Sequence, residues 1–105
     1  MLSYSTDELA TWCSGTWIGN QEVSITGFAI DARKISKGEM FVALKAERDG
    51  HDFAHQAMNN GASSVLVSRE IKGLGIPQLL VKDTLRGFQN MARERRFLFD
   101  RPVIG

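Results

Sequence analysis

The run Met40-Phe41-Val42-Ala43-Leu44 is unbroken in its apolar character and lies between two polar segments, Asp31 to Gly38 and Lys45 to His51. A continuous apolar run of this length is typical of a strand that is buried on both faces of a sheet. The same pattern predicts further strands, at Phe28 to Ile30, Ser64 to Val67 and Gln78 to Val81. The chain is therefore expected to contain a buried sheet with polar loops between its strands.

Helical patterns alternate with these strands. Each helix has an expected cap, namely Ser5 with Glu8 for the first, Asp52 for the second and Asp83-Thr84 for the third. The apolar residues expected on the buried helix faces are Leu9, Trp12 and Cys13, then Phe53, Ala57 and Met58, then Leu85, Phe88, Met91 and Ala92. Small strands are also expected at residues 16–18 and 23–26. Alternating helices and buried strands predict a layered α/β fold, with a mostly parallel or mixed sheet flanked by helices.

The overall composition excludes several classes of function. The chain has 105 residues and a net charge of +1, so no strong field favours nucleic acid or an anionic membrane as a partner. The single cysteine, Cys13, cannot form an internal disulfide and is expected to be a buried structural thiol. Neither a leader nor a membrane-spanning run is found. We expect a single cytoplasmic domain that is monomeric.

Two polar loops are candidates for ligand binding, because ligands of α/β proteins bind beyond the carboxyl ends of the strands. One is Asp31-Ala32-Arg33, and the other is Lys45-Ala46-Glu47-Arg48-Asp49-Gly50-His51. If the two preceding strands are neighbours, their cationic groups share one crevice and suit a phosphorylated ligand. The alternative is that Asp31 with Arg33 and Glu47 with Arg48 are surface charge pairs. His51 and His55 are four residues apart, but no ligand set for a metal accompanies them.

A second class of function rests on the last predicted helix. Arg93, Arg95 and Arg96 could make it a stand-alone interaction or RNA-binding module, although the near-neutral total charge favours an exposed helix face whose arginine stems cover apolar surface. The chain has no Gly-x-x-x-x-Gly-Lys-[Ser/Thr] motif, so it contains no ATP-binding P-loop.

The segment from Asp31 to Phe53, DARKISKGEMFVALKAERDGHDF, resembles the N-terminal domain of the Mur ligases. The similarity continues through Gly61 to Ser68 and Pro77 to Leu85. Within the family, the Lys-x-Glu-Arg loop and the Pro77 to Thr84 segment are more similar to the MurF branch, which adds D-alanyl-D-alanine to UDP-N-acetylmuramoyl-tripeptide, than to the amino-acid-adding MurE branch. The resemblance implies an ATP- and magnesium-dependent carbon–nitrogen ligase of peptidoglycan precursor synthesis, with the UDP end of the substrate bound by this domain.

Carried over by position, the resemblance assigns the UDP-substrate contacts to the two polar loops. The residues are Asp31, Ala32, Arg33, Lys45, Ala46, Glu47, Arg48, Asp49, Gly50 and His51. Ala32 stands where the family usually has Ser or Thr, Ala46 replaces a usual Gly, and the loop is one residue short after Arg48. Residues 1–101 are expected to be the substrate domain, and residues 102–105 the start of the strand that leads into an ATPase domain. We expect no catalytic residue, metal or cofactor in the chain itself.

Overall fold

The fold is that of a computed structural model, which describes residues 5–19, 23, 25–44 and 50–99, and of residues 95–99 the backbone alone. Its elements follow one another in the order α1 (Thr6–Cys13), β1 (Thr16–Ile18), β2 (Phe28–Ala29), η1 (Ala32–Lys34), β3 (Met40–Val42), η2 (Gly50–Phe53), α2 (Ala54–Asn59), β4 (Ser64–Val67), β5 (Gln78–Leu80) and α3 (Thr84–Phe99), where η denotes a 3₁₀ helix. Among the described residues, no helix combines the length and apolar character needed to cross a bilayer.

The strands form one mixed sheet of five strands in the order β1-β5-β4-β3-β2. The pairs β2–β3, β3–β4 and β4–β5 are parallel, and β1 joins the far edge antiparallel to β5. Every residue of β3 and β4 is buried, as the apolar runs predicted. The prediction of a mostly parallel or mixed sheet flanked by helices is confirmed.

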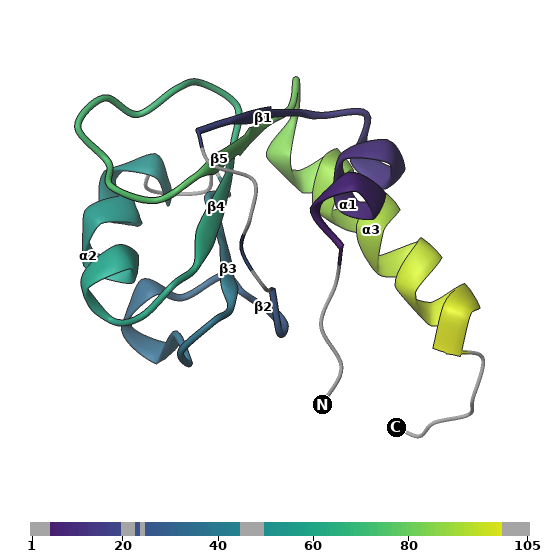
Figure 1. The fold of residues 1–105 in the computed structure, drawn as a ribbon, viewed down its shortest axis with the longest axis horizontal. Helices are drawn as coiled ribbons and strands as arrows, with labels where there is room; N and C mark the ends of the chain where they lie inside the picture. Colours follow the sequence, from purple (N-terminus) through teal and green to yellow (C-terminus); the bar gives the residue numbers. More distant parts are fainter. Residues whose placement is uncertain (1–4, 20–22, 24, 45–49, 100–105) are drawn as a thin grey trace.

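Helices cover both faces of the sheet, with α1 and α3 on one side and α2 on the other (Figure 1). Side chains of β3 alternate between the faces, because successive residues of a strand point in opposite directions. Met40 and Val42 enter the core under α1 and α3 together with Leu9, whereas Phe41 packs in the second core beside α2. The sheet is thus the middle layer of three.

Two of the three predicted N-terminal helix caps are confirmed. The Ser5 hydroxyl accepts hydrogen bonds from the backbone N–H groups of Asp7 and Glu8, at 3.2 and 3.4 Å, and caps α1. Asp83 Oδ1 accepts from the Arg86 N–H at 3.2 Å at the start of α3. The prediction that Asp52 caps the second helix is wrong. The chain enters α2 through η2, which contains Asp52, and the residue preceding α2 is Phe53, which has no capping side chain.

Two further details differ from expectation. Leu85, which was expected on the buried face of α3, is 50% exposed. The prediction holds for Met91, which is buried, and for Phe88, which packs against the same core, and Gly87 lies close to Val81 and Cys13 on this side. Of the strand expected at residues 23–26, the described residues contribute only an isolated bridge at Ile25. Cys13 is buried as predicted, and this burial raises the pKa of its thiol.

Candidate functional site

The pairing of β2 with β3 determines where the candidate loops begin. The two strands are parallel neighbours, with Phe28 opposite Met40 and Ala29 opposite Phe41. Their carboxyl ends therefore lie at the same edge of the sheet, which was the condition for the two loops to form one site. Both 3₁₀ helices that follow these strands, η1 and η2, pack against α2.

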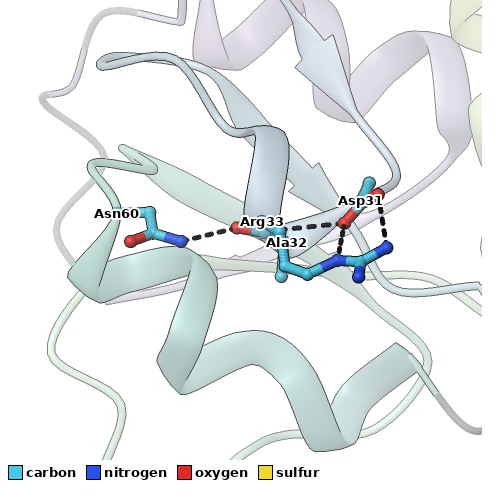
Figure 2. A network of polar contacts seen from close by, with 4 residues as sticks. All are labelled: Asp31, Ala32, Arg33 and Asn60. Carbon is cyan, nitrogen blue, oxygen red and sulfur yellow. Dashed lines mark hydrogen bonds and ion pairs between the residues drawn. The ribbon is translucent and has the colours of Figure 1, made fainter.

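The first loop is organised by the carboxylate of Asp31 (Figure 2). Asp31 Oδ1 accepts hydrogen bonds from the backbone N–H of Arg33 at 2.9 Å and from Arg33 Nε at 3.2 Å, while Oδ2 accepts from Arg33 Nη2 at 3.3 Å. The carboxylate thus caps η1 and holds the guanidinium in a two-point fork. Chiefly because of the side-chain hydrogen bond from Arg33, the pKa of Asp31 is lowered, and the same bond raises the pKa of Arg33.

The Arg33 side chain remains at the surface although it is paired. Its exposed fraction is 75%, against 32% for Asp31. The fork with Asp31 uses two of the five N–H donors of the guanidinium. Asp31 and Arg33 therefore form the surface ion pair that the sequence offered as an alternative, and the pair also gives the guanidinium a fixed orientation at the sheet edge.

Ala32 connects this loop to the face of the sheet that α2 covers. Its side chain is 5% exposed and packs in the core beside Phe41 and Ala57. Its carbonyl oxygen accepts a hydrogen bond from Asn60 Nδ2 at 2.8 Å, which ties η1 to the end of α2 (Figure 2). Nothing local in the sequence marks this contact, which spans 28 residues.

Most of the second loop lies outside the described residues, namely Lys45, Ala46, Glu47, Arg48 and Asp49. The two residues that flank them are hydrogen-bonded to each other: the N–H of Gly50 donates to the carbonyl oxygen of Leu44 at 2.8 Å. A Cβ atom at Gly50 would lie 2.5 Å from that oxygen and 2.7 Å from the Leu44 nitrogen. The approach is so close that only glycine fits here.

His51 is turned into the protein. Its exposed fraction is 3%, and its Nε2 accepts a hydrogen bond from the backbone N–H of Ser68 at 2.9 Å. The Ser68 hydroxyl lies 3.3 Å from the same nitrogen. His55, by contrast, is exposed on α2. In the part of the chain that the structure describes, no group of three or more His, Cys, Asp or Glu side chains could hold a metal ion.

The segment that follows β4 is fixed by side chains from three places. Besides the His51 bond at Ser68, the Gln78 amide exchanges two hydrogen bonds with the backbone of Ile71, at 2.7 and 2.8 Å. The N–H of Gly75 lies 3.3 Å from the sulfur of Met58. This connection between β4 and β5 contains no helix, and these bonds give it a defined path.

A model of the family described as "Mur ligase family, catalytic domain" matches residues 24–95. The UDP-N-acetylmuramoyl-tripeptide–D-alanyl-D-alanine ligase of Escherichia coli is 41% identical over 93 residues, which are 88% of this chain and 20% of that protein. The UDP-N-acetylmuramoyl-L-alanyl-D-glutamate–2,6-diaminopimelate ligase of Oceanobacillus iheyensis is 38% identical over 74 residues, 69% of this chain and 15% of that protein.

The fold is similar to the same part of a solved ligase. A crystal structure of MurF from Acinetobacter baumannii superposes with a TM-score of 0.84 and 28% sequence identity, covering 93% of this chain and 22% of that one. The chain thus spans about a fifth of the length of the D-alanyl-D-alanine ligases that it matches. Sequence and fold agree, and the chain belongs to the Mur ligase family.

Proposed function

We propose that this chain binds the UDP end of UDP-N-acetylmuramoyl-tripeptide within a ligase that adds D-alanyl-D-alanine to it. The observation that carries the proposal is the 41% identity to the Escherichia coli ligase of that name over 88% of the chain. The likeness in fold to MurF over 93% of the chain supports it from a second side. The family to which the chain belongs acts in the synthesis of peptidoglycan precursors, and we expect the protein to work in the cytoplasm as a monomer.

The chemistry of the complete enzyme is assigned to residues outside this chain. In the complete enzyme, ATP with magnesium would supply the phosphoryl group that activates the peptide carboxylate for attack by the incoming amine. The 105 residues contain no P-loop to hold that nucleotide. The part played by this chain is therefore to bind and orient the nucleotide end of the substrate.

Two loops would make the contacts. In the first, the exposed guanidinium of Arg33, oriented by Asp31, suits a diphosphate oxygen, while the backbone around Ala32 is available only in part because its carbonyl oxygen already accepts from Asn60. In the second, we expect the contacts to come from residues 45–50. The parallel pairing of β2 with β3 supports a single site, since both loops leave the sheet at the same edge.

Steady-state assays on the complete protein test the reaction itself. We expect ligation of D-alanyl-D-alanine to UDP-N-acetylmuramoyl-tripeptide. Activity with 2,6-diaminopimelate or lysine on the dipeptide substrate, and none with D-alanyl-D-alanine, would instead assign the protein to the MurE class. The similarity to the Oceanobacillus iheyensis ligase makes this the second candidate.

The loop assignment needs a separate test. Arg33→Gln should raise KM for the UDP substrate about tenfold or more, since a charge-assisted hydrogen bond contributes about 1.5–3 kcal/mol. Arg93→Gln is the matched control, because Arg93 is an exposed arginine on α3. Equal KM values for the two variants would remove Arg33 from the site. RNA binding that weakens in the Arg93 variant would favour the alternative that the chain is a stand-alone RNA-binding module. Of the other two arginines in that hypothesis, Arg95 and Arg96, the side chains lie outside the described part of the chain.

A further inference from the structure

We propose that His51 is a positioning residue, which fixes the carboxyl end of the second loop through Ser68 and affects substrate affinity without touching the substrate. This inference rests on the proposed function, because it concerns the loop that we assign to the UDP substrate. It replaces the direct substrate contact that the resemblance assigns to His51 by a structural link between two loops.

The hydrogen bond defines the state of the imidazole. A backbone N–H can only donate, so Nε2 of His51 must carry a lone pair to accept from Ser68 at 2.9 Å. The neutral ring therefore carries its proton on Nδ1. With 3% of the residue exposed, Nε2 is committed to the protein interior rather than turned toward a ligand.

The neighbouring residue transmits this constraint to the loop. Gly50 lies against the backbone of Leu44 so closely that a Cβ would have no space, and its N–H donates to the Leu44 oxygen at 2.8 Å. Two consecutive residues are thus fixed, Gly50 to the end of β3 and His51 to the end of β4. A shift of the imidazole would move the backbone of Gly50 with it.

The partner of His51 is itself held in place, which makes the link rigid. Ser68 directly follows β4, and the connection beyond it is fixed to β5 by the two hydrogen bonds between Gln78 and Ile71. Adjacent parallel strands β3, β4 and β5 therefore determine jointly where the second loop ends. Such a link acts on the loop geometry and not on the chemistry of ligation.

Two substitutions separate positioning from contact in the complete protein. His51→Leu removes the acceptor, whereas His51→Gln places an amide oxygen near the position of Nε2. We expect His51→Leu to raise KM for the UDP substrate about tenfold, with kcat and KM for the amine substrate unchanged. His51→Gln should recover most of the affinity, and His55→Gln, at the exposed histidine of α2, should match the wild type.

Nuclear magnetic resonance tests the same link by measurements that do not depend on enzyme activity. A coupling through the hydrogen bond should connect the Ser68 amide nitrogen with Nε2 of His51, and the Gly50 amide should exchange faster in His51→Leu but not in His51→Gln. Loss of affinity in both variants, with Gly50 exchange unchanged, would mean that the imidazole contacts the substrate and would overturn the proposal. Unchanged KM and exchange in His51→Leu would overturn it as well. If the wild type does not turn over the UDP substrate, the proposed function fails, while the coupling and exchange still decide the structural link.

Discussion

Replacement of Gly50 by alanine tests the closest backbone approach in the candidate site. The added Cβ would lie 2.5 Å from Leu44 O, 2.7 Å from Leu44 N and 2.9 Å from Ala43 C. These distances are roughly 0.6–1 Å below a normal contact of about 3.5 Å. All three atoms are backbone atoms of the two residues that follow β3, so no side chain can rotate away to relieve the contact. The backbone at residue 50 must therefore move away from the backbone of Ala43 and Leu44.

The cost follows from two contributions. Strain from overfilling a packed region is about 1–3 kcal/mol, and loss of the hydrogen bond from Gly50 N–H to Leu44 O adds about 0.5–1.5 kcal/mol. We therefore expect Gly50→Ala to lower the free energy of unfolding by about 2–4 kcal/mol, and the melting temperature by roughly 10–30 °C. Urea and thermal unfolding, followed by circular dichroism, measure both quantities.

Gly75→Ala is the matched control for this experiment. A Cβ there meets only Met58 Sδ at 3.5 Å, an ordinary contact distance. Because alanine restricts the unfolded chain, the control should be neutral or stabilised by about 0.4–1 kcal/mol. If the two variants unfold within about 0.5 kcal/mol of each other, the close approach of Gly50 to β3 does not exist, and the reasoning about how the second loop is closed fails with it.

Two other substitutions test the helix packing and the ion pair. Gly87→Ala should stabilise α3 by about 0.5–1 kcal/mol in urea unfolding, because alanine favours helix over glycine and its Cβ would meet Val81 no closer than 3.4 Å; a loss of stability would show that α3 lies nearer the sheet than described. The carbon-13 shift of the Asp31 carboxyl group, followed against pH, should give a pKa below the usual aspartate range. Arg33→Gln should raise that pKa, because it removes the side-chain hydrogen bond. Since the pKa is lowered in the folded state, the stabilising contact is present at neutral pH and is lost as pH falls through the folded pKa. An Asp31 pKa that is unchanged in Arg33→Gln would refute the role of the fork.

The buried strands were the most predictable part of the fold. Their continuous apolar runs identified β3 and β4 within a residue or two, since burial on both faces leaves little place for polar side chains. The buried face of α3 was predictable in part, since Met91 and Phe88 pack in the core as their spacing indicated. Leu85 is exposed and Gly87 is buried instead, because a glycine has no apolar side chain for a periodicity to detect.

The local contacts of the candidate loops were predictable from the sequence, whereas their long-range contacts were not. The sequence indicated the two loops and the possibility of an ion pair between Asp31 and Arg33, which are neighbours along the chain. It did not indicate Asn60 or Ser68, whose bonds to Ala32 and His51 span 28 and 17 residues. A polar histidine beside a charged loop suggests a ligand contact, and only the packing of β4 against that loop reveals a buried hydrogen bond.

The two faces of the sheet have different consequences for how the chain assembles in time. The core beside α2 is built from buried residues between Ala32 and Val67, whereas the opposite core joins Leu9 of α1 to Met91 of α3. During synthesis from the amino terminus, the first face can close while α3 is still being made. Helix α1, although it is made first, has to wait for its partner, because α1 and α3 pack against each other. The helix that is synthesised first can therefore pack against its partner only after α3 has been made.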